Sequence, residues 1–492
     1  METVLPQSIN FSNPLPQGVP AVQKRRKFYP STGAAFGPGL NPEIRIDLES
    51  ANMLLDPVNS YLNFTFQNDD VSAVGLEISD SVFFDTLRIE QGGRVISRIE
   101  NYNRLQCSVL APAQMGVNGV VSETLTCAQK GGAANGARSS NPIGVAAPGN
   151  TYANLAHNNT GQLAQGHQWK FSVPIMGGLF TQDKLIPLPL LKPGNPISIV
   201  LSLTNGENIG AWAAAGGPIA PIPYTLTEVC YCASMVEVGR DVMDHIRDVQ
   251  DRMGGQLVIS SQDWEYASTQ VPIAARNEFI ARVPARHRSI KSLFWNCNSE
   301  DFATNTVAGQ NVGNFYNLSY AGTMNGLNYQ LKVGSVVFPP QPVAMAGASA
   351  PAVNAACQFR RSEMITETAK AFGSLGWTAP TGIMNTITYA SGTSGQGNGD
   401  NGTVVGGGQE ECPSGGGTIC GFMAGLDLDS WARVALEGGV DTETMALESN
   451  LIITIDPASL IGPGLEPKTL NMWVLYDTHF YFNRDGMITF SN

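Results

Sequence analysis

The residues best suited to catalysis or metal binding are few in this sequence. Its five histidines form neither an HxH nor an HExxH motif, so the ligand spacing of a cupin or zincin metal site is missing. The sequence also contains no GxSxG nucleophile elbow and no GK[ST] phosphate loop. The run GQGNGDNG at residues 395–402 has the glycines of a dinucleotide-binding loop, but no strand and helix pattern frames it. We therefore expect no catalytic residues, no cofactor and no metal site, and we expect that the protein is not an enzyme.

One acidic pair remains as a candidate for chemistry. Asp427 and Asp429 are two residues apart in a predicted strand, so both side chains would project from one face. They could act as paired carboxylates, and a two-domain β-sandwich hydrolase would depend on them alone. We favour the alternative of a solvent-facing acidic pair at the end of a strand.

The eight cysteines are scattered, and none of them forms a CxxC pair or stands at ligand spacing from a histidine. Several lie in apolar patterns, where a free thiol packs as a small hydrophobic group. This pattern favours reduced cysteines and folding inside a cell. Cys412 and Cys420 flank PSGGGTI and could form a disulfide across that loop, an alternative that stays open.

One basic cluster could bind an anionic partner. Lys24, Arg25, Arg26 and Lys27 lie within residues 1–41, which we expect to be an N-terminal arm because prolines interrupt it and no hydrophobic period is sustained. Such a cluster can be a nuclear import signal or a patch for an anionic surface. The alternative is a solvated charge run that holds the arm against its own protein, whose formal net charge is −12.

The elements that would position these residues follow a pattern that occurs twice. Residues 168–204 read as a strand, a compact Gly, Leu and Pro passage and a second strand, and residues 224–238 add a third apolar run. Residues 422–455 and 470–483 repeat this order, and in both halves a helix and a long glycine-rich loop precede it. A repeat of half the chain predicts two domains of one kind, although two unrelated β domains could share such short patterns.

Other patterns set the predicted boundaries. Residues 42–237 would form the first domain, and Gly92 and Gly93 predict a hairpin within it. Residues 238–255 carry an apolar stripe at helical spacing and acidic residues near their start, which predicts a connecting helix. Residues 256–492 would form the second domain. Its predicted features are a helix at about 351–372 and a strand that leaves the sheet at Pro339 and Pro340.

The composition fits a protein that buries large interfaces. Of its 492 residues only 14% are charged, well below the usual quarter, while glycine and proline are abundant. The net charge of −12 argues against a surface devoted to nucleic acid. No secretory signal pattern is visible, and no run of about 20 strongly apolar residues predicts a membrane span.

Three passages carry a family resemblance: FSVPIMGGLFTQDKLIPLPLL before ISIVLSL, YQLKVGSVVFPPQPV before its helix, and GLDLDSWARVALEGGVDT. In these passages the chain resembles the double jelly-roll major capsid proteins. That family includes adenovirus hexon and the coats of several tailless phages, large DNA viruses, virophages and polinton-like viruses. The resemblance covers nearly all of residues 42–492 and is closest in size and motif style to the virophage and polinton-like coats.

The resemblance implies an all-β fold of two tandem eight-stranded antiparallel jelly rolls, with a few short helices and long loops. Hexon is much longer, so we do not expect large outer towers on this chain. The implied function is a major capsid protein that forms homotrimeric, pseudo-hexagonal capsomers of an icosahedral DNA virus shell. Two similar barrels per chain under threefold symmetry give six near-equal sides, which is a physical reason for that assembly.

The resemblance also implies partners and a location. The partners would be further copies of the chain, neighbouring capsomers, penton proteins and minor or cement proteins. The protein would reside in the virion after synthesis and assembly inside the host cell. The arm with Lys24, Arg25, Arg26 and Lys27 would lie underneath the shell, in weak contact with internal partners or the genome.

A carbohydrate-binding or adhesive β-sandwich protein, similar to a fibre or a lectin, is the alternative from another class. Such a protein would be expected to expose aromatic residues in its loops and to carry secretion signals. The long loops contain little tryptophan apart from Trp212 and Trp377. The sequence therefore favours the capsid interpretation.

Overall fold

A computed structural model describes the chain in fifteen segments, to which all structural statements here refer. They are residues 21–70, 74–76, 80–110, 165–166, 168–182, 184–205, 209–212, 223–271, 278–299, 326–344, 362–375, 424–429, 438–443, 449–455 and 468–491. The predicted loop disulfide between Cys412 and Cys420 and nearly all of the two long glycine-rich loops lie outside the described residues.

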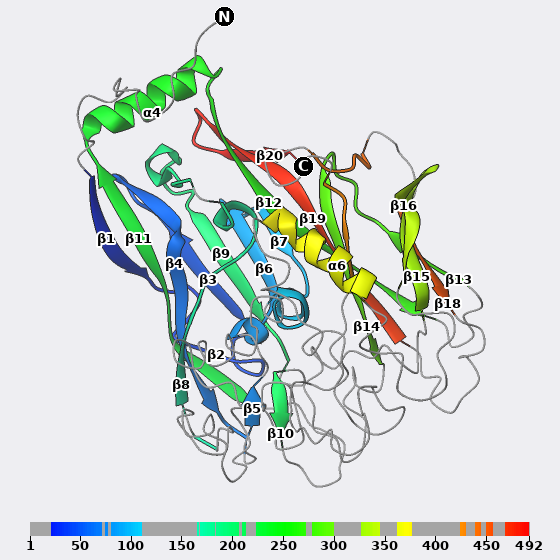
Figure 1. Ribbon diagram of the computed structural model, residues 1–492. Coiled ribbons are helices and arrows are strands. Elements are labelled where there is room, and N and C mark those ends of the chain that lie inside the picture. Colours follow the sequence, from blue (N-terminus) through cyan, green and yellow to red (C-terminus); the bar gives the residue numbers. More distant parts are fainter. Residues whose placement is uncertain are drawn as a thin grey trace, which may run out of the picture.

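The strands between residues 21 and 238 form two larger sheets that share one core (Figure 1). The first sheet has the order β1 (Ala21–Phe28), β11 (Tyr224–Val238), β4 (Met53–Asn68) and β8 (Gln168–Val173), and β2 (Ala35–Phe36) also pairs with β11. The second has the order β3 (Glu43–Leu48), β9 (Ile197–Leu203), β6 (Phe84–Gln91) and β7 (Arg94–Ile99). The short strands β5 (Val74–Leu76) and β10 (Gly210–Trp212) pair separately.

The strands between residues 256 and 491 form two more sheets. One has the order β12 (Gln256–Val271), β19 (Lys468–Asn483), β14 (Ile290–Ser299) and β17 (Ala424–Asp427), and β20 (Ile488–Ser491) also pairs with β19. The other has the order β13 (Glu278–Val283), β18 (Ser449–Ile455), β15 (Gly326–Val333) and β16 (Val336–Ala344). The pairs in all four of these sheets are antiparallel.

The two halves have the same topology. Taken in chain order, the strands β1, β3, β4, β6, β7, β8, β9 and β11 occupy the same places in their sheets as β12, β13, β14, β15, β16, β17, β18 and β19. In each half one sheet is built from the first, eighth, third and sixth strand, and the other from the second, seventh, fourth and fifth. This is the strand order of an eight-stranded jelly roll. The all-β fold with two tandem jelly rolls is therefore confirmed.

The predicted arm at residues 1–41 needs a correction. Residues 21–28 are not part of an arm, because they form β1, which pairs with β11 over its whole length, from Ala21 opposite Val238 to Phe28 opposite Tyr231. The basic residues hid this strand from a pattern search, since an edge strand can carry exposed charges on both faces. Residues 21–41 thus supply the first strand of the first unit and the short strand β2.

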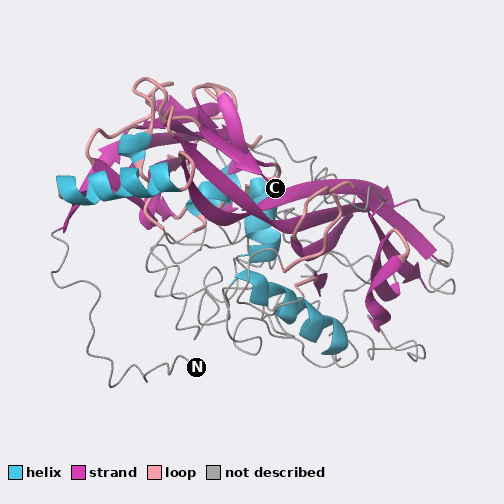
Figure 2. Cartoon of the chain, turned by 90° about the horizontal axis from the view of Figure 1, so that it is seen from above, coloured by secondary structure: helices cyan, strands magenta, loops and turns pink. Residues whose placement is uncertain are grey.

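The helices lie outside the strand layers, as Figure 2 shows for the two longest. The predicted connecting helix is α4 (Arg240–Arg252), which joins β11 to β12. The short helix predicted before the first glycine-rich loop is α1 (Tyr102–Arg104), which continues as a π-helical turn, η3 (Leu105–Leu110). The helix predicted at about 351–372 is α6 (Ser362–Ala371), followed by the 3₁₀ turn η9 (Phe372–Leu375). The 3₁₀ turns η2 (Asp80–Phe83), η6 (Gly178–Phe180) and η7 (Leu188–Leu190) lie in the first unit.

Two clusters of buried side chains hold the sandwiches together. In the first unit, alternation along β4 and β8 points Phe64, Phe66 and Phe171 inward, where they pack against Phe83. The second unit has its own cluster around Trp295 and Tyr329, whose rings meet edge to face. The first cluster continues across the boundary between the units through Trp264, Phe294 and Trp473 of the second.

The hairpin predicted at Gly92 and Gly93 joins β6 to β7 and is confirmed. The prediction that the chain leaves the sheet at Pro339 and Pro340 is only partly right. Both residues stay within β16, but β16 is an edge strand, where prolines are tolerated. The pairing with β15 is interrupted there and resumes at Val343, opposite Tyr329.

Candidate interaction surface

The four predicted contact residues Lys24, Arg25, Arg26 and Lys27 lie together on β1. All four are exposed, and β1 is the outer strand of its sheet. An edge strand has one row of backbone N–H and C=O groups that the sheet leaves unpaired. We call the surface that runs along the strands of a unit, between its two ends, a side wall. The cluster therefore lies on a side wall of the first unit.

Alternate residues of β1 project from opposite faces of the sheet. Lys24 and Arg26 share a face with Phe28, which enters the core. Lys24 forms an ion pair with Glu237, and the Arg26 guanidinium lies 4.7 Å from the centre of the Phe28 ring. These two cations are thus engaged by their own subunit.

Arg25 and Lys27 project from the outer face, away from the core. Arg25 Nη2 donates a hydrogen bond to Tyr61 Oη at 2.6 Å, and it also lies 3.5 Å from Cys232 Sγ. Hydrogen bonding to Cys232 raises the pKa of Arg25. Lys27 points from the same face, opposite Cys232 in the register.

The rest of this outer face carries an ion pair and two buried thiols. Lys170 donates to Glu228 at 2.9 Å, and this hydrogen bond raises the pKa of Lys170 and lowers that of Glu228. Cys230 and Cys232 are free, buried thiols beneath the longer side chains, as the sequence predicted for cysteines in apolar patterns. Burial raises the pKa of Cys230 to about 11, which keeps this thiol protonated at neutral pH.

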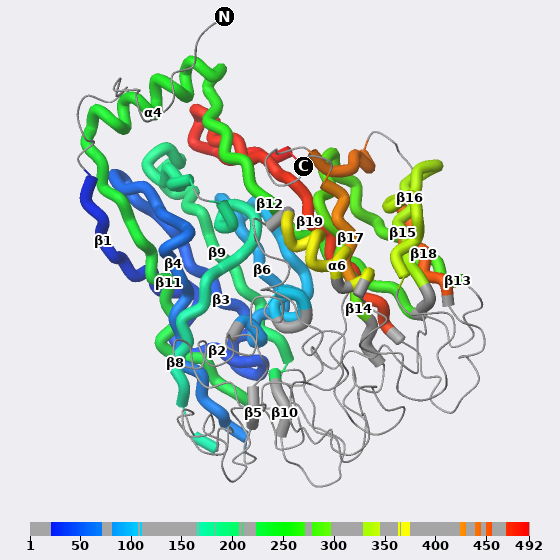
Figure 3. Tube along the Cα trace, viewed as in Figure 1, coloured from blue at the N-terminus to red at the C-terminus, as the bar shows by residue number. Residues whose placement is uncertain are grey.

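The boundary between the two units shows how such a side wall can be covered. We call this boundary the seam. The first unit contributes β7, η6, α1, Gln91 at the end of β6 and Lys192 to it, and the second contributes β12, β19, β20 and Gly486. Figure 3 shows the first unit, coloured blue to green, beside the second, coloured green to red. The central group of the seam is Asp263 on β12, which accepts hydrogen bonds from Ser97 Oγ at 2.6 Å and from the Gly178 backbone N at 3.1 Å. Burial raises the pKa of Asp263 to about 6.

Close packing at the seam depends on two glycines. Gly178 has φ 46°, and a Cβ there would lie 2.6 Å from Ser97 Oγ of its own unit and 3.3 Å from Asp263 Oδ2 across the seam, so a larger residue would disturb the contact of these three groups. Gly486, between β19 and β20, has φ 78° and sits against the backbone of Lys192 in the first unit. Its carbonyl accepts hydrogen bonds from Gln91 Nε2 at 2.8 Å and from Lys192 N at 3.2 Å. Sequence reasoning missed Asp263 and both glycines.

The helix α1 also reaches across the seam. Arg104 Nη1 donates to Asn471 Oδ1 on β19 at 3.4 Å, and Asn471 accepts a further bond from Tyr266 Oη of β12 at 2.8 Å. Burial lowers the pKa of Arg104, while the nearby Tyr266 opposes that shift. A helix that follows the fifth strand of one unit therefore contacts the first and eighth strands of the next.

The helix α6 of the second unit is acidic on its exposed side, and its C-terminal end lies on the same face of the β14 sheet that meets the first unit. The helix α6 packs against β17 and β14 through buried residues such as Met364 and Thr368, and it leaves Glu363 exposed. Glu367 is paired with Lys370, one turn along, at 2.5 Å. Asp427 lies nearby on β17, and burial, followed by the charge of Asp429, raises its pKa.

The paired-carboxylate hypothesis for Asp427 and Asp429 fails on geometry, and our prediction that both face solvent is also wrong for Asp429. The strand β17 ends at Asp427, so the alternation does not extend to Asp429. Asp429 turns inward and forms a buried ion pair with Lys291 Nζ at 3.2 Å, and Asp477 lies 3.5 Å from the same ammonium. The two carboxylates thus occupy different environments and do not face a common substrate site.

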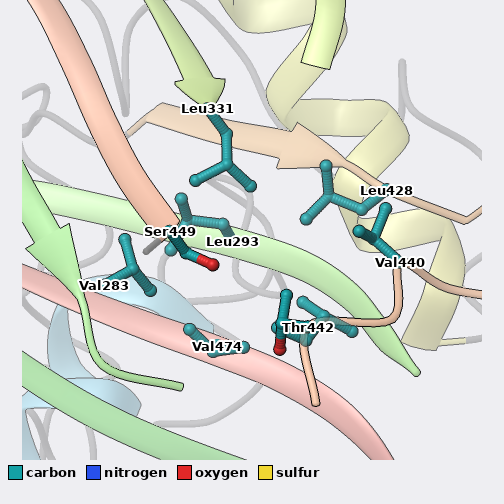
Figure 4. Close-up of a pocket in the computed structure, with 9 residues that line it drawn as sticks. Val283, Leu293, Leu331, Leu428, Val440, Thr442, Ser449 and Val474 are labelled. Atoms are coloured by element: carbon teal, nitrogen blue, oxygen red, sulfur yellow. The ribbon is translucent and has the colours of Figure 1, made fainter. Parts of the chain in front are cut away.

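The described part of the chain has two hollows. A cavity of about 10 Å³ in the second sandwich is lined mainly by apolar side chains, including Val283, Leu331 and Val474 (Figure 4). It has room for no more than about one water molecule. An open hollow of about 430 Å³ is lined by residues 37–40, Asp69, Asn205 and residues 223–225. The carboxylate of Asp69 is already hydrogen-bonded to Gln67 and Thr225.

Within the segments that the structure describes, no group of three or more His, Cys, Asp or Glu residues is placed to hold a metal ion. No helix in the described segments has the length and apolar character needed to cross a membrane.

Comparison with known sequences and with solved structures gave contrasting results. Neither a protein-family model nor a curated protein sequence matches the chain. Solved structures match it almost end to end. The Faustovirus major capsid protein has a TM-score of 0.55 at 9% identity, with 97% of this chain and 92% of that chain covered.

Two further solved structures resemble the chain to a similar degree. The PBCV-1 protein VP54, whose crystal structure has been fitted into a cryo-EM reconstruction of the virophage Sputnik, has a TM-score of 0.54 at 11% identity, with coverage of 98% and 99%. The cryo-EM structure of the Sputnik virophage has a TM-score of 0.53 at 12% identity, with coverage of 100% and 93%. At such identities the likeness concerns the fold, and it spans both halves of the chain.

Proposed function

We propose that this chain, which has the double jelly-roll fold of viral major capsid proteins, is itself a major capsid protein. The observation that carries the proposal is the exact repetition of one eight-strand order within a single chain. The near end-to-end match to capsid protein structures supports it. Fold likeness alone does not assign function, so the argument also rests on how the two units are joined.

The proposed assembly is a homotrimer with six jelly rolls and a pseudo-hexagonal outline. In the chain, the two units are joined through different surfaces: one presents β7, η6 and α1, and the other presents β12, β19 and β20. Such a head-to-tail contact leaves one unsatisfied surface of each kind at the two ends of the chain. Rotational repetition of a head-to-tail contact can close a ring, and three copies of a two-unit chain give six units.

The proposed orientation places the jelly rolls upright in the shell. The first described residue, Ala21, pairs with Val238 just before α4, and β20 near the other terminus contacts β7 of the first unit. Figure 1 shows α4 and β20 at the same end of the molecule. We assign this end to the interior of an icosahedral DNA virus shell, where penton, minor or cement proteins and the genome would be partners. The side walls would then meet other copies, and the protein would reside in the virion after assembly inside the host cell.

The rival function of a carbohydrate-binding or adhesive protein is not favoured by any described surface. Within the described segments, the exposed large aromatic side chains are Tyr29 and Phe490, and they do not gather into a binding platform with a pocket. We therefore propose only the capsid function.

The test is the mass of the purified protein in solution, measured by light scattering after size-exclusion chromatography. The proposal predicts a stable species with the mass of three chains. A monomer over the whole concentration range would contradict it. A screen against a glycan array, run in parallel, would reveal selective sugar binding if the rival function were correct.

A further inference from the structure

The second unit holds a buried lysine between two buried carboxylates, and these groups have no role in the function proposed above. Lys291 Nζ lies 3.2 Å from Asp429 Oδ2 and 3.5 Å from Asp477 Oδ2. The side chains of Lys291, Asp429 and Asp477 are 3%, 5% and 1% exposed, respectively. They come from three neighbouring parts of one sheet, because β14, which carries Lys291, runs between β17 and β19. We call these three residues the lysine triad.

Backbone hydrogen bonds fix both carboxylates beside the lysine. Leu428 N donates to the Lys291 carbonyl at 2.8 Å, which places the next residue, Asp429, beside the ammonium group. On the other side, Asp477 N donates to the Ser289 carbonyl at 3.0 Å, and Ser289 Oγ donates to Asp477 Oδ2 at 2.6 Å. The lysine triad is therefore held in one arrangement by the strands that carry it.

Burial of these charges is costly, and one reaction between them would remove most of the cost. Each buried charge has lost its hydration, and the triad holds more carboxylates than ammonium groups. A lysine amine and a carboxyl group can join as an amide with loss of water, which eliminates one positive and one negative charge. The adjoining residues Ile290 and Leu428 are apolar and buried, and a dry site favours a reaction that releases water.

We propose that the lysine triad is a self-modification site, at which Lys291 Nζ forms an amide, known as an isopeptide bond, with Asp429 Cγ. Asp429 is the acceptor because its carboxylate is the nearer of the two. Asp477 is the general base, because the hydrogen bond from Ser289 holds its Oδ2 within reach of Nζ. Reacting groups fixed about 3–3.5 Å apart behave as if each were present at ~10⁵ M or more, so no further catalyst is needed.

The atoms of this step balance without a co-reactant. The ion pair in the structure is the state before the reaction. The ammonium group of Lys291 gives one proton to Asp477 and becomes a nucleophilic amine. The amine attacks Asp429 Cγ, the C–N bond forms, and the bond from Cγ to one carboxylate oxygen breaks. That oxygen takes the proton returned by Asp477 and a second proton from Nζ, and it leaves as water.

The product would be a covalent link between β14 and the segment that follows β17. Asp477 ends the step as it began, and the new amide N–H can donate a hydrogen bond to it. A link between positions far apart in the sequence restricts the unfolded chain and so stabilises the folded one. The inference does not rest on the capsid function, because it concerns only the interior of the second unit.

The test is the intact mass of the purified, denatured protein, followed by peptide mapping. The expected mass is lower than that of the sequence by one water molecule, and a branched tryptic peptide should join Lys291 to Asp429. Lys291→Arg keeps the positive charge but has no reactive amine, so its full sequence mass should return. Asp477→Asn keeps both reacting groups but removes the base, and it should slow the appearance of the linked chain after synthesis by about a hundredfold or more.

The matched control is Lys170→Arg. Lys170 lies 2.9 Å from Glu228, but both side chains are exposed, so this pair should stay unlinked. The variant should show the same loss of one water as wild type, and its peptide map should show the same branched peptide.

A wild-type chain with the full sequence mass overturns the inference and leaves the lysine triad as an ion pair. A branched peptide that joins Lys291 to Asp477 overturns the roles given to the two carboxylates. A link that forms in Asp477→Asn at the wild-type rate shows that Asp477 is not the base. Circular dichroism checks each fold, and if Asp477→Asn fails to fold, Ser289→Ala decides, since it removes the hydrogen bond that holds Asp477 and should also slow the link.

Discussion

The carboxylate of Asp263 makes the seam between the two units sensitive to pH. It is buried and accepts hydrogen bonds from Ser97, from the Gly178 backbone and from the Trp264 backbone N, the last at 2.9 Å. Burial raises its pKa from 3.8 to about 6 despite these bonds. The folded protein therefore holds a proton on Asp263 at pH values where the unfolded chain has lost it.

The sign of the effect follows from proton linkage. Because the folded state binds more protons than the unfolded state between about pH 4 and pH 6, the free energy of unfolding falls as the pH rises through that window. For the two pKa values above, the loss between about pH 4.5 and pH 7.5 amounts to about 2 kcal/mol. Above the pKa of Asp263 in the folded protein, this loss of stability is complete, and Asp263 no longer changes the free energy of unfolding as the pH rises.

The substitution Asp263→Asn removes the titration and keeps the shape. The amide oxygen can still accept from the Gly178 and Trp264 backbone, and the amide nitrogen can donate to Ser97 Oγ. The stability of the variant relative to wild type should therefore rise by about 2 kcal/mol from pH 4.5 to pH 7.5. Urea titrations of both proteins at several pH values measure this difference.

The control for this experiment is Asp248→Asn, an exposed position on α4. It should follow wild type at every pH. Curves for wild type and Asp263→Asn that run parallel over the whole range would refute the assignment of a protonated Asp263 at the seam.

Two other predictions concern a buried lysine of the second unit and a glycine at the seam. Replacing Lys291 with Met leaves the buried carboxylates of Asp429 and Asp477 without their shared cation, so we expect a loss of about 3–5 kcal/mol in the free energy of unfolding. Lys332→Met, on the exposed side of β15, should change it little, and equal effects would contradict the buried pair. Gly486→Ala should lower the melting temperature more than Gly93→Ala, because both glycines have positive φ but only Gly486 also abuts Lys192. Equal shifts for these two variants would mean that the close approach at the seam does not matter.

Much of the architecture could be predicted from the sequence because long alternating strands leave a clear pattern. The runs that became β8, β9 and β11, and later β17, β18 and β19, were recognised as two copies of one unit. The connecting helix α4 was predicted from its stripe of apolar residues, although Met253 in that stripe is exposed. Hydrophobic periodicity reports burial against the same chain, and these elements are buried mostly by their own unit.

The strand β1 could not be predicted in this way. Its residues AVQKRRKF are exposed apart from Phe28, so no alternation marks them, and prolines lie on both sides. What holds the strand in place is backbone pairing to β11, which leaves no trace in side-chain type.

The groups at the seam were missed for a related reason. Asp263 reads as an ordinary polar position in an alternating strand, and only the fold brings it to Ser97 and Gly178, at separations of 166 and 85 residues. The adjacent glycines 177 and 178 were a usable signal, since paired glycines between strands often mark close backbone approach. Lys291 gave no signal, because a single lysine in a strand is usually exposed.

The most direct test of the whole account is the outline of the purified particle in negative-stain electron microscopy. Two jelly rolls per chain and a repeated head-to-tail contact predict particles with three chains and a hexagonal outline when viewed along their axis. Class averages that show single two-lobed particles, or rings with a different number of lobes, would contradict it.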